Sequence, residues 1–159
     1  DWSSDVCSSD LIGCSSGYGV QFMPDGVTYK GIDYDPIIVG VAREQDWRPG
    51  CQFVSGDINA LEIEPCDTII AFEVIEHIDN GIEVVERLKK LCKRLLITVP
   101  MNEPSGFWGP HHKLHMLNES HFPGADYWYI NEAGDISTNR FEITEQNRLN
   151  LLLCRWTNV

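Results

Sequence analysis

The sequence L-I-G-C-S-S-G-Y-G-V at residues 11–20, followed by G-I-D at residues 31–33, decides the fold. A glycine-rich turn lets a ligand approach the backbone closely, and an acidic residue about 20 positions later can accept hydrogen bonds from ribose hydroxyls. The two features together predict a site for a nucleoside cofactor, placed where the first strands of an α/β sheet end.

Strands and helices are expected to alternate after this turn. A helix is expected to begin at Pro36, and apolar positions between residues 80 and 94 recur at the spacing of one helix face. The pattern predicts an α/β fold of the Rossmann-like, doubly wound kind, in which a mostly parallel sheet has helices on both faces. Strands are expected at residues 29–33, 51–57, 68–72 and 95–99, of which 68–72 is a short apolar run typical of a strand buried on both faces.

The segments quoted so far, with G-D-I-N at residues 56–59 and C-D-T-I-I-A-F-E-V-I-E-H-I at residues 66–78, resemble the class I S-adenosylmethionine-dependent methyltransferases. The resemblance covers residues 12–100. It implies that S-adenosylmethionine is the cofactor and that a methyl group is transferred to an acceptor, which we expect to be a small molecule. Cofactor contacts are implied for Gly13, Cys14, Ser15, Gly17, Asp33, Tyr34, Asp57, Ile58, Phe72, Glu73 and Val74.

The resemblance also implies a role for each group of residues. Asp33 would accept both ribose hydroxyls, and Asp57 would lie near the adenine amino group with Ile58 beside the ring. The backbone of residues 72–74 would approach the methionine part of the cofactor. Ser15 departs from the family pattern, because a glycine is usual there and a side chain could crowd the cofactor.

Residues 1–11, D-W-S-S-D-V-C-S-S-D-L, lack the apolar run of a buried parallel strand. They resemble the translation of a sequencing-adapter primer, with Leu11 as the junction codon where the family usually has an acidic residue; a genuine flexible N-terminus is the alternative. We therefore predict an N-terminally truncated fragment whose first strand is missing or replaced. Residues 12–159 would form a single methyltransferase-like domain, with residues 12–100 binding the cofactor and residues 101–159 supplying an acceptor loop and edge strands.

Beyond residue 100 the sequence is rich in Pro, Gly and His, which is typical of a long loop. Residues 127–130 and 149–156 fit two antiparallel edge strands, although the second fits a helix equally well. Phe107 and Trp108 are candidates for the wall of an acceptor pocket, whereas the aromatic residues 127–129 are expected to bury the edge of the sheet.

Histidines in this loop are the candidates for a catalytic base, because imidazole can remove a proton near neutral pH. The motif H-H-x-x-H places His111, His112 and His115 close together, with His121 following. Zinc binding is the alternative, but Gly109 and Pro110 favour a loop over the helix it needs, so no metal is predicted. His77, which follows the fourth strand, is expected to pack rather than to catalyse.

Composition excludes several other functions. The chain has 12 basic and 24 acidic residues and a net charge of −12, which disfavours nucleic acid and anionic membranes as partners. No apolar run approaches the roughly 18 residues that span a bilayer. Six cysteines without paired spacing are typical of reduced thiols, so a cytoplasmic location is expected. One helix at residues 80–94 is expected to carry a basic face formed by Arg87, Lys89, Lys90, Lys93 and Arg94.

Two other functions remain open at this point. A nicotinamide-dependent oxidoreductase shares the glycine turn and the acidic residue, but the motifs at residues 56–59 and 72–78 would have no role in it. A cofactor-binding relic without catalysis is the other alternative, since Ser15 and the absent acidic residue would permit it. The oligomeric state and the identity of the acceptor stay open.

Overall fold

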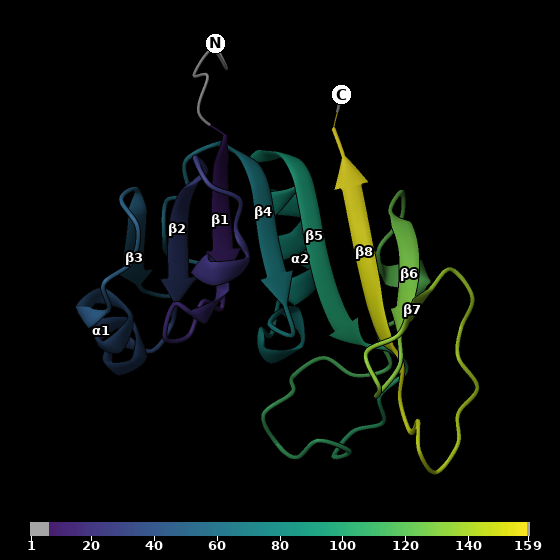
Figure 1. Cartoon of the computed structure of the whole chain (residues 1–159). Coiled ribbons are helices and arrows are strands. Elements are labelled where there is room, and N and C mark those ends of the chain that lie inside the picture. Colours follow the sequence, from purple (N-terminus) through teal and green to yellow (C-terminus); the bar gives the residue numbers. More distant parts are fainter. Residues whose placement is uncertain (1–6, 159) are drawn as a thin grey trace.

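The computed structural model describes residues 7–158, which contain an eight-stranded sheet in the order β3-β2-β1-β4-β5-β8-β6-β7 (Figure 1). Strands β1 to β5 pair in parallel, whereas β8 and β6 pair antiparallel. The predicted doubly wound, mostly parallel α/β fold is therefore confirmed. The elements are β1 Ser8–Ile12, η1 Tyr18–Phe22, β2 Thr28–Asp33, α1 Pro36–Glu44, β3 Cys51–Ser55, β4 Cys66–Phe72, η2 Ile75–His77, α2 Gly81–Leu88, β5 Cys92–Pro100, η3 Glu119–His121, β6 Asp126–Ile130, β7 Ile136–Ser137 and β8 Leu151–Thr157.

Helices cover both faces of the sheet. Val39 of α1 packs in one apolar cluster with Tyr29 of β2, whereas Leu88 of α2 packs in the other cluster with Ile32 of the same strand. Successive side chains of a strand point to opposite faces, so residues three positions apart also face opposite ways. The two helices therefore lie on opposite sides of the sheet, and the arrowheads of β1 to β5 all point to the same end of it (Figure 1).

The central position of the sheet is filled by Ser8–Ile12, which pairs with β2 on one side and with β4 on the other. The place of the first strand is thus taken by residues that mostly belong to the polar tract, although their composition did not suggest a strand. Backbone pairing on both sides supplies the hydrogen bonds, and the amide of Ser8 donates to Asp67 Oδ2 at 2.8 Å. This strand buries the polar side chains of Ser9 and Asp10, which lowers the stability of the sheet.

The predicted helix at residues 80–94 is shorter than expected. Helix α2 ends at Leu88, and β5 begins at Cys92, which pairs with Cys66 of β4. Lys93 and Arg94 therefore lie on a strand, and the expectation of one basic helix face was wrong. The apolar spacing continued through Leu91 and misled the prediction, because the first residues of a buried strand are apolar as well.

The C-terminal part of the sheet agrees with the prediction of antiparallel strands. β8 lies between β5 and β6, so the helical alternative for residues 149–156 was wrong. The two-residue strand β7, which the sequence did not suggest, forms the outer edge beside β6. In the part of the chain that the structure describes, no helix has the length and apolar character to cross a membrane. The six cysteines are all free.

Candidate functional site

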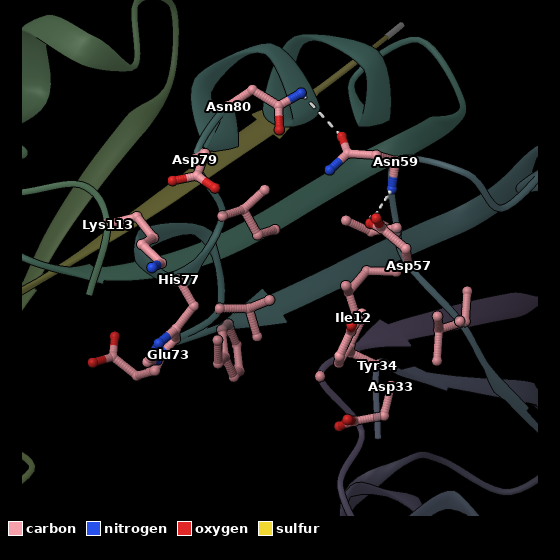
Figure 2. A pocket seen from close by; sticks show the side chains of 17 residues that line it. Ile12, Asp33, Tyr34, Asp57, Asn59, Glu73, His77, Asp79, Asn80 and Lys113 are labelled. Atoms are coloured by element: carbon pink, nitrogen blue, oxygen red, sulfur yellow. Dashed lines mark hydrogen bonds between the residues drawn. The ribbon is translucent and has the colours of Figure 1, made fainter. Parts of the chain in front are cut away.

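A cleft of about 670 Å³ opens at the carboxyl ends of β1 to β4, where the loops following these strands converge (Figure 2). Its volume lies within the range of about 300–1,000 Å³ typical of small-molecule sites. The cleft is at the edge of the sheet where ligands bind in open α/β folds. Of the residues singled out from the sequence, those that line it are Gly13, Asp33, Tyr34, Asp57, Ile58, Phe72, Glu73 and Val74.

The floor of the cleft is made by the turn after β1. Gly13 has a φ of +73°, and its amide donates to the carbonyl of Ile32 at 2.8 Å. A Cβ atom at Gly13 would stand 2.3 Å from Cγ2 of Val74, which lies at the end of β4. Only glycine satisfies both the left-handed backbone and this close approach of two loops.

Cys14, Ser15 and Gly17 are not among the residues that line the cleft; they build the turn behind it. Cys14 is buried, and burial raises the pKa of its thiol to about 12, so the thiolate is disfavoured. A Cβ atom at Gly17 would meet the ring of Phe53 at 2.8 Å. Ser15 is exposed and does not line the cleft.

Ser15 nevertheless adopts a left-handed backbone with a φ of 49°. We expect the Ser15→Gly variant to raise the free energy of unfolding by about 0.5–1 kcal/mol, because relief of the left-handed conformation outweighs the added freedom of the unfolded chain. Urea unfolding followed by circular dichroism measures the difference. A variant no more stable than the parent chain would show that the turn holds serine without strain.

Asp33 and Asp57 lie on the same side of the cleft, at the ends of β2 and β3 (Figure 2). Asp33 accepts hydrogen bonds from the amides of Ser15 at 2.8 Å and Asp35 at 3.0 Å, and Asp57 accepts from the amide of Asn59 at 2.8 Å. A carboxylate has about four lone-pair sites, so both groups can accept further hydrogen bonds from a ligand. Their backbone partners fix the direction in which the carboxylates point.

Several lining residues were not predicted from the sequence. Asn59 and Asn80 close one end of the cleft through a hydrogen bond of 3.0 Å between their side chains (Figure 2). Asp79 and Lys113 also line it, and so does His77. The signal for Asn59 was its position just after a predicted strand. Asp79 and Asn80 follow η2 instead, and Lys113 comes from a loop whose path the sequence does not reveal.

The opposite side of the cleft is formed by the turn after β4, which is acidic and buried. Glu73 has a left-handed φ of 54°, and its amide donates to the carbonyl and the hydroxyl of Thr98, each at 3.1 Å. Burial raises the pKa of Glu73. Glu76 is only 1% exposed, and burial together with the nearby carboxyls of Glu73 and Glu103 raises its pKa to about 8.

The three histidines that were predicted to supply a base take different positions. His111 is exposed, and its carbonyl oxygen lies 3.2 Å from Nδ1 of His77. His112 is partly buried, with Nδ1 at 2.6 Å from Oε2 of Glu103 and its ring edge-on to that of His77. Nδ1 of His115 is buried and has no hydrogen-bond partner in the described chain. His112 is thus the one of the three that stacks on a residue of the cleft.

The aromatic residues of the C-terminal part lie away from the cleft. Phe107 and Trp108 are not part of its lining; they pack edge to face, and the guanidinium of Arg148 lies 5.4 Å from the Trp108 ring. Tyr127 donates to the carbonyl of Phe122 at 2.6 Å, and Arg155 stacks on Trp128. The expectation that residues 127–129 cover the end of the sheet agrees with these contacts.

Fold and cleft together define a Rossmann-like domain with a cleft of ligand size at the carboxyl ends of its parallel strands. The methyltransferase domain family matches residues 11–97, which is more than half of the chain. The chain therefore belongs to this family, and it is a class I S-adenosylmethionine-dependent methyltransferase. Among curated protein sequences, none is similar enough to this chain to count as a match.

Solved structures of methyltransferases share the fold. The plantazolicin methyltransferase BpumL, in complex with a triazolic desmethyl-plantazolicin analogue and S-adenosylhomocysteine, superposes with a TM-score of 0.70 at 15% identity over 99% of this chain and 79% of its own. Magnesium protoporphyrin IX methyltransferase from Synechocystis, with bound S-adenosylhomocysteine, superposes with a TM-score of 0.66 at 16% identity, which covers 97% of this chain and 74% of its own. A putative methyltransferase in complex with the Haloferax volcanii methyltransferase activator Trm112 superposes with a TM-score of 0.68 at 16% identity, which covers 99% of this chain and 86% of its own.

Proposed function

We propose that this methyltransferase holds S-adenosylmethionine in the cleft of Figure 2 and methylates a small-molecule acceptor. One observation carries the proposal: Gly13, Asp33, Asp57 and Val74, which come from the ends of four strands, line the same cleft. Each of them was expected at the cofactor site from the sequence, and their convergence in space is what a shared ligand requires.

The residues of the cleft suit the parts of this cofactor. Asp33 would accept hydrogen bonds from the ribose hydroxyls, and Asp57 would accept from the adenine amino group beside Ile58. The backbone of residues 72–74 would face the methionine part. When bound, S-adenosylmethionine supplies a methyl group on a sulfonium sulfur, which is a good leaving group. The contribution of the chain is then to align the reacting atoms and to exclude water.

The charge of the cleft supports this cofactor over a dinucleotide. Asp33, Asp57, Glu73 and Asp79 line it, against a single lysine, Lys113. Carboxylates attract a cationic sulfonium and ammonium group, whereas they repel the pyrophosphate of a nicotinamide cofactor. The same argument disfavours nucleic acid as the acceptor, because the chain as a whole carries a net charge of −12.

The acceptor requires a base only if it must lose a proton. Among His111, His112 and His115, we propose His112 for this role, because the carboxylate of Glu103 fixes the orientation of its ring. The ring of His112 packs edge-on against His77, which lines the cleft on the side opposite Asp33 (Figure 2). A proton from the acceptor would therefore leave the cleft on that side.

The cofactor site is tested with Asp33→Asn, for which we expect the affinity for S-adenosylhomocysteine to fall at least roughly 10-fold, since one acceptor of the ribose hydroxyls becomes a donor. Isothermal titration calorimetry on the whole chain measures the affinity. Asp35→Asn is the matched control, because asparagine caps a helix as well as aspartate does and Asp35 does not line the cleft.

Three outcomes separate the alternatives. Binding of S-adenosylhomocysteine with transfer of a labelled methyl group supports the enzyme, whereas binding without transfer to any acceptor tried supports a relic. Binding of a nicotinamide dinucleotide in place of S-adenosylhomocysteine would contradict the proposal, and so would equal loss of affinity in the Asp33 and Asp35 variants.

A further inference from the structure

Glu76, His77 and His112 come together beside the cleft, and we propose that they bind a divalent metal ion. A carboxylate oxygen of Glu76 and one ring nitrogen of each histidine all lie within 4.8 Å of one another. Two imidazoles and a carboxylate favour a first-row transition ion such as Mn²⁺, Co²⁺ or Zn²⁺ over Mg²⁺ and Ca²⁺, which prefer oxygen ligands.

The carboxyl group of Glu76 is the first observation behind this site. Its side chain is 1% exposed, and within residues 7–158 neither carboxyl oxygen has a hydrogen-bond partner. Oε1 points toward His77, with 4.0 Å between it and Nε2 of that ring. A buried carboxyl without partners is costly unless it is paired or coordinates a metal. Glu76 therefore has both the position and the unused capacity of a ligand.

The orientation of the two histidine rings is the second, independent observation. Nδ1 of His77 lies 3.2 Å from the carbonyl oxygen of His111, which can only accept, so Nδ1 carries the proton and Nε2 has a free lone pair. Nδ1 of His112 lies 2.6 Å from the carboxylate of Glu103, which likewise leaves Nε2 as the donor atom for a ligand bond. Metal-binding histidines are usually held in this way, by a carbonyl or carboxylate on the other nitrogen.

The backbone holds the loop that carries His112 against the turn that carries Glu76. The carbonyl oxygen of Glu76 accepts hydrogen bonds from the amides of Lys113 at 2.7 Å and Leu114 at 3.0 Å. His112 directly precedes these two residues, so its ring is placed beside Glu76 without any help from a ligand. Pre-formed ligands of this kind lower the cost of ordering a metal site.

The carboxyl groups around the cluster give a cation an electrostatic role. Glu103 is 1% exposed, and Oε1 of Glu73 is buried without a hydrogen-bond partner in the described part of the chain. The carboxyl groups of Glu73, Glu76 and Glu103 repel one another when they are ionised. A divalent ion would balance this charge.

The metal site changes the role proposed above for His112. With a cation bound, Nε2 of His112 is a ligand and does not accept a proton from the acceptor. If no cation binds, His112 keeps the role of base that the proposed function gives it. The geometry of the metal site does not depend on the cofactor, so the two proposals fail separately.

The test is a titration of the metal-free whole chain with Co²⁺, Zn²⁺, Mn²⁺ and Mg²⁺, one at a time and without cofactor. We expect one transition ion per chain, with visible absorption bands for the Co²⁺ complex, and weaker binding of Mg²⁺. Glu76→Gln and His77→Ala should each lower the affinity for Zn²⁺ by roughly 10- to 100-fold or more. Glutamine has the shape of glutamate and the His77 side chain is 43% exposed, so both variants should fold.

His111→Ala is the matched control, because it removes an exposed imidazole next to His112 and keeps the carbonyl that orients His77. Its affinity for Zn²⁺ should equal that of the parent chain. The proposal is overturned if the folded chain takes up none of the four ions at one per chain, or if His111→Ala loses as much affinity as His77→Ala. Binding of S-adenosylhomocysteine with no metal uptake would sink the metal site alone.

Discussion

Replacing Gly13 by alanine is expected to lower the affinity for S-adenosylhomocysteine by roughly 10- to 100-fold, because overpacking of this size costs about 1–3 kcal/mol. The new Cβ atom would stand 2.3 Å from Cγ2 of Val74, which itself lines the cleft. Valine is restricted in its rotation about χ1 and cannot easily turn away. The turn after β1 and the end of β4 would therefore separate, and the surface that receives the cofactor would change shape.

A matched control separates this clash from backbone strain. Gly134 has a φ of +86°, and a Cβ atom there would meet nothing within 4 Å. Gly134→Ala therefore carries a similar left-handed penalty without the clash, and we expect calorimetry to give an unchanged affinity. If Gly13→Ala bound S-adenosylhomocysteine within about threefold of the parent chain, the turn would not be part of the cofactor site.

Replacing Asp10 by valine is the second change with a large expected effect, this time on stability. Asp10 lies in the middle of β1, is 5% exposed, and pairs in register with Lys30 of β2 and Ile69 of β4. Burial raises the pKa of its carboxyl from 3.8 to about 6, although the charge of Lys30 opposes the shift. An apolar residue of similar size removes this penalty, so we expect the free energy of unfolding at pH 8 to rise by about 2–3 kcal/mol.

The pH dependence of stability gives this prediction its sign. The folded state holds the proton of Asp10 more tightly than the unfolded state does, because its pKa is raised on folding. The free energy of unfolding should therefore fall as the pH rises from about 4 to about 6, and the contribution of Asp10 should stay unfavourable above that range. In Asp10→Val and Asp10→Asn this contribution disappears. Asp46→Asn, at an exposed site, should behave as the parent chain does.

Urea unfolding between pH 4 and pH 8 measures all four proteins. Asp10→Asn separates the charge from the polarity, since asparagine keeps the shape and a buried polar group; it should fall between the parent chain and Asp10→Val. A parent chain more stable than Asp10→Val at pH 8 would contradict the burial of this carboxyl in the sheet.

The sequence predicted most of the parallel half of the fold because its signals are local. The strands β2 to β5 are short segments separated by turns or helices, and β4 contains an apolar run at residues 68–72. The start of α1 is fixed by Pro36 and by Asp35, whose side chain accepts from the amide of Ile37. The strand at Ser8–Ile12 was not recognised, since two buried polar residues hide its pattern. It forms because β2 and β4 would each have one side unpaired without it, which is a property of the whole sheet.

The candidate site was predictable where it follows strands and hidden where it depends on a loop. Asp33 and Asp57 are the last residues of predicted strands, so their convergence follows from parallel topology alone. The contact of Glu76 and His77 with His112 joins residues far apart in sequence through a segment of irregular backbone. The motifs E-x-x-E-H at residues 73–77 and H-H at residues 111–112 together were a signal for such a cluster. The spacing of the histidines within the loop did not by itself show which of them lie near a carboxylate.

The direction of the outer strands has a practical result for binding experiments. β8 runs antiparallel to β5, with Thr157 opposite Arg94, so β8 ends where β1 begins, at the amino ends of the parallel strands (Figure 1). The loops that form the cleft lie at the carboxyl ends of these strands. A fluorophore or a surface anchor attached after Thr157 therefore sits a full strand length from the ligand, and immobilised protein presents its cleft to the solvent.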